Sequence, residues 1–577
     1  MPRRFTAGAL VAALLALIAV TATTVSAHPG GDSSRHERTG HGDGPVSHVL
    51  LISVDGLHQS DLAWYMRRHP DSELAQLASS GTAYYRAQTP IPSDSFPGML
   101  AQVTGGNPRT TGVYYDAAYS HALLAPDSTC PGGTPGAPVS YDESLDLNPD
   151  SIDAGQGLPG LPDGVLAMTS NPFTVIDQSK LPLDPSTCQT ISPHQYLKVN
   201  TIFDVAKAHG LRTAWSDKHA AYDVLQGPSG HGIDDLFTPE INSVALHHDG
   251  TPYGGDWTTD NAATRQYDAY KVQAIVNEID GYDHTGTGPK VGVPAIFGMN
   301  FQTVSTAEKL PRSEGTVGGP QLNGGYLPHT RTPGPLLADA LGWLDSELAT
   351  MADELRAQGL ANSTAIILSA KHGQSPQDPT ALTRIDDGTI IDGLNSAWRA
   401  HLDNPSAPDL VAGGTNDDAL MLWLSDRSPE AARFTAQWLM SHPATGTTYN
   451  AADPTTAGPS RTLPSSGLVR VFTGRAAARY FGVEPSDPRH PDVWGVVQHG
   501  VVYTGGTKKI AEHGGPAPED RDVPLLVDVP RKKHGKQIGA SVETTQIAPT
   551  ILRLLGLDPS QLQAVQREGT HSLPGLG

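Results

Sequence analysis

The sequence predicts an α/β protein built on a mostly parallel sheet with helices on both faces. Two observations predict this fold. Apolar, strand-like runs alternate along the chain with helix-like segments. Several of these runs also end in polar residues, where an open parallel sheet places its ligands. With 577 residues, 38% of them hydrophobic, the chain is long enough to bury a large core.

The expected elements follow one another in a regular order. The strands are short apolar runs, and the helices carry the 3.6-residue pattern or begin and end at typical capping residues. Strands are expected over 47–56, 82–90, 211–219, 293–302, 364–373, 418–425, 494–504 and 522–530. Helices are expected over 71–81, 97–106, 199–210, about 260–280, 334–359 and 544–557.

Two stretches interrupt this order. Residues 120–195 lose the periodicity and gain Pro and Gly, which indicates an insertion. Residues 376–500 are mixed in pattern and are interpreted as a subdomain. The sequence has no internal repeats.

The N-terminus has the features of an export signal. Arg3 and Arg4 precede an apolar run over 7–20, and Val25-Ser26-Ala27 is typical of a cleavage site. Residues 1–27 are therefore predicted to be a signal peptide, with an uncleaved anchor as the alternative. Residues 28–46 are polar and rich in Gly and His, which predicts a disordered linker. We expect a secreted protein without a stable membrane anchor, because no second apolar stretch of spanning length follows.

The chain is strongly acidic, with a formal net charge of −21. Removing residues 1–27, which carry two arginines and no carboxylate, brings this to −23. Such a charge repels phosphate polymers, so binding to nucleic acid polymers or anionic membranes is not expected. A site for a small phosphorylated molecule would need positive charge of its own.

Only two cysteines occur, Cys130 and Cys188. In an exported chain, one disulfide between them is the simplest expectation, and two free thiols are the alternative. Both lie in the Pro- and Gly-rich insertion, so the bridge would hold the insertion rather than the core.

Polar residues gather at the ends of four expected strands, and a fifth candidate, His513, stands just before a polar stretch and the strand over 522–530. Any one of them is also compatible with a turn or a satisfied surface residue, but their joint occurrence on five segments predicts a site at one edge of the sheet. They are Asp55, Asp217-Lys218-His219, Asn300 with Gln302, Lys371-His372 and His513.

A candidate nucleophile precedes one of the helices. Ser95 stands two residues before Pro97, where the backbone N–H groups of a helix N-terminus stabilise an anion. A serine hydroxyl becomes an effective nucleophile when a base, a cation or a metal lowers its pKa. The alternative is an ordinary helix-capping serine.

Together these segments resemble the type I phosphodiesterase/nucleotide pyrophosphatase family of the alkaline phosphatase superfamily. The similar segments are VLLISVDGL, PSDSFPGMLAQVTGGNPRTTGV, ILSAKHGQS, EHGG with VPLLV, and TTQIAPTILRLLGL, in the family order. The resemblance implies an alkaline-phosphatase-like catalytic domain over 47–577. It also implies that Ser95 is the nucleophile and that Asp55, Ser95, His372 and His513 are metal ligands.

The sequence departs from the family pattern at three places. The family has Asp-His-Gly where this chain has Lys371-His372-Gly373. An Asp-x-x-x-His pair should follow PAIFGMNF, but only Gln302 and Glu308 offer oxygen atoms there. Finally, Asp116 stands near the family's phosphate-binding Asn. These departures indicate one divalent metal ion, expected to be zinc, rather than the family's two.

The two charged replacements suggest a hypothesis about Lys371. An ammonium group beside a divalent ion costs several kcal/mol at about 4 Å, so Lys371 points away, is neutral, or takes over part of the ion's role. It could stabilise the transition state, with Asp116 as its ion-pair partner. A turn position is the alternative for Asp116. Asp217 and Lys218 are expected to bind the phosphate or sulfate group of the substrate, or else to lie in a solvated loop.

The expected function is that of a secreted phosphoric-ester hydrolase of the phosphodiesterase/nucleotide pyrophosphatase type. Ser95 would attack phosphorus, with Lys371 and Asp116 assisting. One alternative is a phosphomonoesterase or sulfatase-like hydrolase, because this fold accommodates several substrates. The other is a non-catalytic protein that keeps the fold and an anion pocket.

Overall fold

The computed structural model of the chain describes residues 45–531 and 535–576. The predicted signal peptide over 1–27 and most of the predicted linker over 28–46 lie outside these ranges. Within the described part, no helix combines the length and apolarity that crossing a membrane requires.

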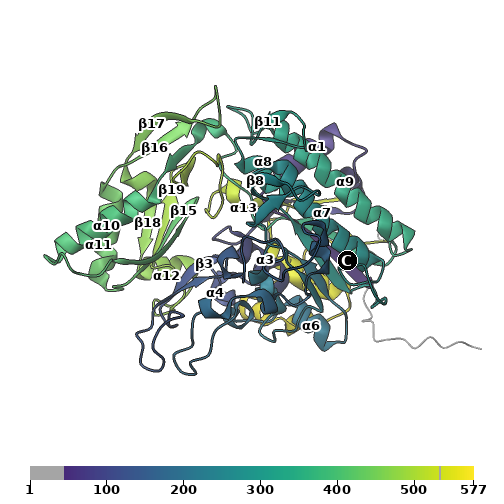
Figure 1. The fold of residues 1–577 in the computed structure, drawn as a ribbon, viewed down its shortest axis with the longest axis horizontal. Helices are drawn as coiled ribbons and strands as arrows, with labels where there is room; N and C mark the ends of the chain where they lie inside the picture. Colours follow the sequence, from purple (N-terminus) through teal and green to yellow (C-terminus); the bar gives the residue numbers. More distant parts are fainter. Residues whose placement is uncertain (1–44, 532–534, 577) are drawn as a thin grey trace, which may run out of the picture. The chain divides into compact units, whose positions relative to one another are not determined.

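A nine-stranded sheet forms the centre of the protein, as predicted (Figure 1). Its strand order is β22-β2-β21-β12-β1-β9-β5-β6, with β23 (Val542–Glu543) beside β2. The order comprises β22 (Lys536–Ile538), β2 (Thr82–Gln88), β21 (Asp522–Asp528), β12 (Thr364–Ser369), β1 (His48–Val54), β9 (Ile296–Phe301), β5 (Ala214–Ser216) and β6 (Asp235–Phe237). All pairs are parallel except those made by β21, so the sheet is mostly parallel.

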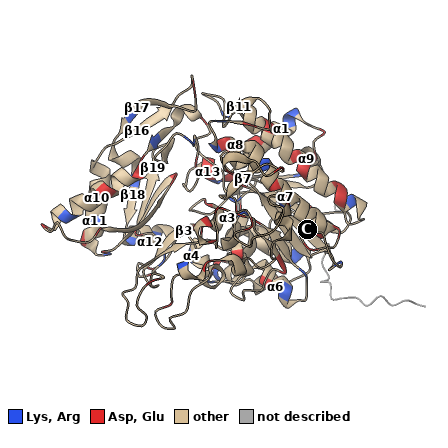
Figure 2. Ribbon diagram, viewed as in Figure 1, with Lys and Arg blue, Asp and Glu red and all other residues tan. Residues whose placement is uncertain are grey.

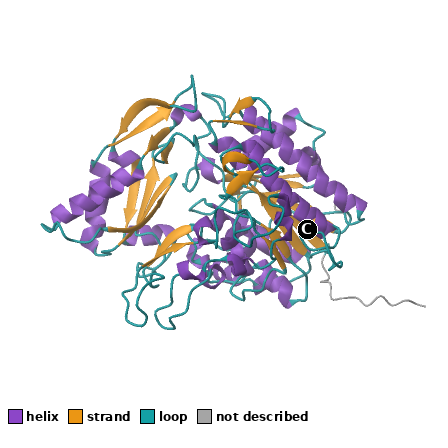
Figure 3. Cartoon of the chain, in the orientation of Figure 1, coloured by secondary structure: helices purple, strands orange, loops and turns teal. Residues whose placement is uncertain are grey.

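Helices surround the strands of this sheet (Figure 3). They form two sets, and each set packs among its own members. One set consists of α1 (Gln59–Arg68), α2 (Glu73–Ser80), α7 (Asn261–Ile279), α8 (Thr303–Lys309) and α9 (Pro335–Ala357). The other consists of α3 (Ser95–Thr104), α4 (Pro108–Thr111), α6 (Ile202–Ala208), α14 (Ile547–Leu554) and α15 (Gln563–Glu568). This separation agrees with the predicted helices on both faces.

The central strand β1 shows that the sheet is covered on both faces. Every residue of β1 is buried, and its run HVLLISV is apolar without alternation, as expected when helices cover both faces of a parallel strand. β12 is nearly as buried. Their side chains join one large hydrophobic cluster that extends into the helices.

Residues 383–503 form two further four-stranded sheets with a hydrophobic cluster of their own, coloured green in Figure 1. The first contains β17 (Ala457–Leu463), β16 (Ala444–Tyr449), β13 (Thr383–Ile385) and β20 (Val501–Tyr503). The second contains β14 (Val411–Asn416), β15 (Ala419–Leu424), β19 (Val493–Val497) and β18 (Leu468–Thr473). Helices α10 (Asp387–His401), α11 (Pro429–Ser441) and α12 (Arg475–Phe481) accompany them.

The expected single strand over 494–504 is wrong. The chain turns at Gly500, which has a φ of 81°, so the two halves become β19 and β20 in different sheets. A positive φ at this position is available to glycine at little cost. The sequence HGVV therefore contains a turn that the apolar pattern concealed.

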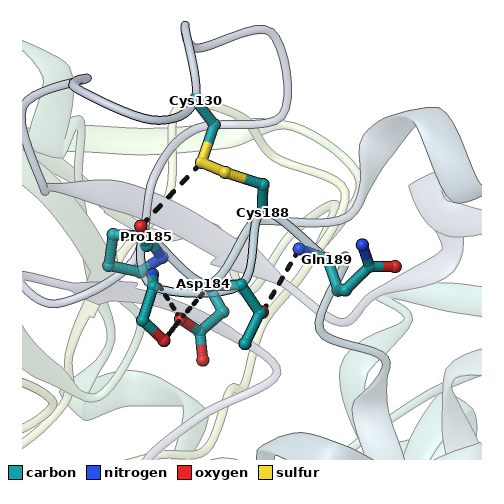
Figure 4. The surroundings of a disulfide bond; sticks show 7 residues. Cys130, Asp184, Pro185, Cys188 and Gln189 are labelled. Atoms are coloured by element: carbon teal, nitrogen blue, oxygen red, sulfur yellow. Dashed lines mark hydrogen bonds between the residues drawn. A yellow bond between two sulfur atoms is a disulfide. The ribbon is translucent and has the colours of Figure 1, made fainter.

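The insertion over 120–195 is mostly short 3-10 helices and loops. The structure joins Cys130 to Cys188 in a disulfide with a Cα–Cα distance of 5.7 Å (Figure 4). Beside it, the backbone carbonyl of Asp184 accepts a hydrogen bond from the N–H of Cys188 at 2.8 Å. The bridge closes a loop within the insertion and leaves the central sheet untouched.

Charged side chains of both signs are interspersed on helices such as α9 and α10 (Figure 2). Helix α9, for example, carries carboxylates along its length and Arg356 in its last turn. These helices therefore form no single positively charged surface, and a phosphate group would need positive charge from a local site.

Candidate active site

The predicted polar residues meet at the carboxyl edge of the central sheet. The pairings Ser53↔Ser369, Val54↔Phe301 and Ser216↔Met299 bring the ends of β1, β12, β9 and β5 level with one another. As a result, the residues that follow these strands can lie together, although they are up to 317 positions apart in the sequence. They are Asp55, His372, Gln302 and Asp217.

Ser95 is the first residue of α3, and the side chain of Asp94 caps this helix by accepting the N–H of Phe96 at 2.9 Å. The helix therefore starts two residues earlier than the sequence suggested. Its first turn packs tightly against the backbone of Lys371: a Cβ on Gly98 would lie 2.1 Å from the Lys371 carbonyl oxygen. This close approach, which requires glycine, brings Ser95 to the end of β12.

Three side chains converge on the Ser95 hydroxyl. Its Oγ lies 3.3 Å from Asp55 Oδ2 and 3.2 Å from His372 Nε2, and it accepts a hydrogen bond from Lys218 Nζ at 3.2 Å. All three partners are buried or nearly so, with Lys218 the most accessible at 14% side-chain exposure. The arrangement surrounds one hydroxyl with an anion, an imidazole and a cation.

Asp55 is held as a carboxylate. Its Oδ1 accepts the amide of Asn300 at 2.8 Å, and its Oδ2 accepts the amide of Gln302 at 2.6 Å. Burial alone would raise the pKa of Asp55, but nearby positive charge, foremost that of Lys371, lowers the pKa below its ordinary value. Asp55 is therefore an ionised oxygen donor.

His372 presents a lone pair to Ser95. Burial lowers the pKa of His372 to about 3, so the ring is neutral. Its Nδ1 lies 3.0 Å from the carbonyl oxygen of Gly373, which places the proton on Nδ1 and leaves Nε2 free to accept. The His513 ring lies against this ring at a tilt of 36°, with centroids 3.9 Å apart, but its Nδ1 makes no hydrogen bond within the described chain.

Lys371 turns away from Ser95, and its predicted partner is wrong. Its Nζ donates to Asp217 Oδ1 at 2.9 Å and to the Tyr222 hydroxyl at 2.7 Å, and it lies 4.3 Å from the centre of the Tyr222 ring. Asp116 instead accepts the N–H of Ala117 at 2.6 Å. Asp217 provides the closer carboxylate because it follows β5, at the same edge of the sheet as Lys371.

The position of Asp217 does not support the expectation that it contacts substrate. Its side chain is fully enclosed between Lys371 and the indole N–H of Trp215, which donates to Oδ2 at 2.9 Å. Lys218, the next residue, does face Ser95. In this loop, the side chain of Asp217 therefore contacts Lys371, whereas that of Lys218 contacts the Ser95 hydroxyl.

A cavity of about 370 Å³ opens beside Ser95. The predicted residues that line it include Ser95, Asp116, Lys218 and His513. The sequence interpretation missed Lys309 and Lys509, which both pair with Glu512. Burial would raise the pKa of Glu512, but these two ammonium groups lower it to about 2. Their only signal in the sequence is that Glu512 immediately precedes His513.

The donor set fits one divalent ion. Ser95 Oγ lies 3.3 Å from Asp55 Oδ2 and 3.2 Å from His372 Nε2, and the distance between Asp55 Oδ2 and His372 Nε2 is 3.8 Å. A triangle of this size leaves room for an ion about 2 Å from each atom, the usual distance for zinc. Lys371 stands where the resemblance implies a fourth ligand. Lys218 Nζ lies 4.0 Å from Asp55 Oδ2, so a bound ion would share the site with an ammonium group.

A second ion does not fit in the family position. Gln302 donates to Asp55, and Glu308 faces Tyr326 and His58 rather than the cavity. The carboxylate nearest to His513 is instead that of Asp94, whose Oδ1 lies 3.7 Å from His513 Nδ1. In the described residues, the three-residue group of possible metal ligands is His58, Asp61 and Glu308, outside this cavity.

Comparisons with known proteins agree with the fold. Residues 49–132 match the family model described as Type I phosphodiesterase / nucleotide pyrophosphatase. This segment contains Asp55 and Ser95. Among curated protein sequences, none matches this chain significantly.

Two solved proteins share the architecture at low sequence identity. The murine ectonucleotide pyrophosphatase/phosphodiesterase 5 is 11% identical, with a TM-score of 0.50 over 89% of this chain and 96% of that one. It has also been solved as an inactive variant in complex with AMP. The alkaline phosphatase PafA is 14% identical, with a TM-score of 0.55 over 88% of this chain and 96% of that one. Both support an alkaline-phosphatase-like fold.

Proposed function

Because the chain has the fold of the alkaline phosphatase superfamily and matches the type I phosphodiesterase/nucleotide pyrophosphatase model over residues 49–132, we propose that it is a secreted phosphoric-ester hydrolase with Ser95 as its nucleophile. The observation that carries this proposal is the convergence of Asp55, His372 and Lys218 on the Ser95 hydroxyl beside a cavity. A small phosphate diester or nucleotide is the proposed substrate.

In the proposed reaction, Ser95 Oγ loses its proton and attacks phosphorus, and the ester oxygen leaves and takes up a proton as an alcohol. Water then hydrolyses the phosphoryl-serine, which releases the phosphate product and restores the Ser95 hydroxyl. Lys218 Nζ is close enough to Oγ to stabilise both the alkoxide and a non-bridging phosphoryl oxygen. His372 Nε2, with a pKa too low for an effective base, accepts a hydrogen bond from the Ser95 hydroxyl and orients it when its lone pair is not committed to an ion. The N-terminus of α3 adds further positive potential at the same place.

One divalent ion, proposed to be zinc, would be held by Asp55, Ser95 and His372, with His513 at the cavity wall. When bound, it would lower the pKa of the hydroxyl and neutralise charge on the phosphoryl group. Lys371 is paired with Asp217, and its positive charge lowers the pKa of Asp55 without contact with Ser95. Asp116 lines the cavity, where it can face the remainder of the substrate.

The test is hydrolysis of p-nitrophenyl phosphate and bis-p-nitrophenyl phosphate by the purified full chain. We expect the diester to be the better substrate. A higher kcat/KM for the monoester would favour the phosphomonoesterase alternative, and activity on an aryl sulfate the sulfatase alternative. Binding of AMP without hydrolysis of any ester would support the non-catalytic alternative.

Lys218→Met is expected to lower kcat/KM by about 100-fold, the scale of losing one preorganised donor to the developing charge. Lys508→Met, at an exposed lysine outside the residues that line the cavity, is the matched control and should leave the rate unchanged. Initial rates over a range of diester concentrations measure both. An unchanged rate in Lys218→Met would contradict its contact with the reacting group.

Removal of the ion is expected to lower kcat by about 100-fold or more, because a bound ion supplies several kcal/mol of charge stabilisation. The measurement is activity before and after exhaustive chelation, and again after zinc is returned. Full activity in a chain shown to contain no metal would contradict the single-ion site. It would leave Lys218 and His372 as the groups that activate Ser95.

A further inference from the structure

A second cluster of possible metal ligands lies outside the cavity. His58 Nδ1, Asp61 Oδ2 and Glu308 Oε1 all lie within 4.8 Å of one another. The Tyr326 hydroxyl is 2.8, 2.7 and 2.9 Å from these atoms, respectively. His58 and Asp61 stand at the start of α1, and Glu308 belongs to α8. Four donor atoms from three parts of the chain thus surround one point.

The hydrogen bonds of His58 fix which ring nitrogen faces the cluster. Its Nε2 lies 2.9 Å from the carbonyl oxygen of Gln374 and 2.8 Å from that of Glu519. The backbone N–H of Gln374 also lies 3.1 Å from His58 Nε2. If Nε2 carried a lone pair instead of a proton, the carbonyl oxygens of Gln374 and Glu519 would receive no hydrogen bond from His58. The proton therefore belongs on Nε2, as in most histidines that bind metal through the other nitrogen.

The charges in the cluster are unbalanced without a cation. Asp61 and Glu308 are completely buried, and His58 is the only basic side chain within ion-pairing distance of them among the described residues. Asp61 Oδ1 is also buried and has no hydrogen-bond partner in the described chain. An unpaired buried carboxylate oxygen is costly, whereas a divalent ion with a neutral imidazole compensates both negative charges.

The surroundings also resemble the outer shell of a metal site. Glu308 Oε2 accepts the side-chain amide of Gln374 at 2.8 Å, which orients Glu308 Oε1 toward the cluster. Gln374 in turn accepts the hydroxyl of Ser305 at 2.6 Å. Such partners fix the orientation of metal-binding carboxylates. All four donors come from the protein, as in structural rather than catalytic sites.

We propose that His58, Asp61, Glu308 and Tyr326 bind one divalent transition-metal ion, of the zinc type, as a closed structural site. The ion would tie the start of α1 to α8 and, through Gln374, to the segment after β12. These segments are adjacent to the active site: Gly56 N–H donates to the His372 carbonyl at 3.1 Å, and a Cβ on Gly56 would lie 3.1 Å from Glu308 Oε2. The site would therefore hold Asp55 and His372 in register.

The first test is metal content. The full chain, produced with zinc and passed through a weak chelator, is analysed by plasma mass spectrometry beside Glu308→Gln, Asp61→Asn and Asp55→Asn. We expect the first two variants to contain one equivalent less than the wild type. Asp55→Asn should retain the ion of this cluster. If a metal ion is lost in Glu308→Gln but retained in Asp55→Asn, that ion belongs to this cluster. This conclusion holds even if the proposed active-site ion proves absent.

The second test does not depend on whether those variants fold. Tyr326→Phe removes one donor but no charge, and it should release its ion to a strong chelator faster than the wild type does. Anomalous diffraction at the zinc edge should give a peak about 2 Å from His58 Nδ1. No peak there in zinc-soaked crystals, or equal metal content in wild type and Glu308→Gln, would overturn the proposal in favour of a metal-free network with a charged His58.

Discussion

Ser95→Ala is expected to abolish hydrolysis of phosphate esters, with kcat reduced on the order of 1,000-fold or more because the nucleophile itself is lost. Among the residues that the structure describes, no other hydroxyl contacts Asp55, His372 and Lys218 together. Binding of AMP should change little, because Lys218 and the α3 N-terminus remain. The measurement is kcat with bis-p-nitrophenyl phosphate, together with AMP affinity by calorimetry.

Ser95→Thr is the matched control for this prediction. It keeps a hydroxyl at the same position, so we expect substantial activity. Equal thermal unfolding midpoints of the two variants would exclude a folding defect. If Ser95→Ala hydrolyses the diester as fast as wild type, Ser95 is not the nucleophile and the proposed function fails.

Lys371→Met is expected to have the largest effect on stability, lowering the free energy of unfolding by about 3–5 kcal/mol. The substitution preserves the bulk of the side chain but removes the cation that pairs with the fully buried carboxyl group of Asp217. Unfolding in urea, followed by circular dichroism, measures the change.

Asp217→Asn provides the second half of a double-mutant cycle. The double variant should recover most of the lost stability, since no unpaired charge remains and an Asn oxygen can still accept the Trp215 indole N–H. Strictly additive losses would show that Lys371 and Asp217 do not act as a pair. Activity of the double variant then isolates the effect of the Lys371 charge on Asp55, because the neighbouring packing is preserved.

Local sequence patterns determined the central part of this fold. The apolar run before Asp55 and the run before Lys371-His372 are long enough to identify buried strands, and the helix after Ser95 follows from its composition. Because the carboxyl ends of parallel strands share one edge, the sequence also brought Asp55, Ser95 and His372 into one predicted site. Their spacing around the hydroxyl is consistent with that prediction.

Only the tertiary structure decided which charged groups pair. Asp116 and Asp217 were both available to Lys371, and the order β12-β1-β9-β5 selected Asp217 from 154 residues away. The same applies to Glu308, which the sequence places just after Gln302 but which α8 turns toward His58 and Tyr326. The physical reason is that strand and helix formation depend on near neighbours, whereas a buried charge takes its partner from whatever side chains the packed elements bring within about 3 Å.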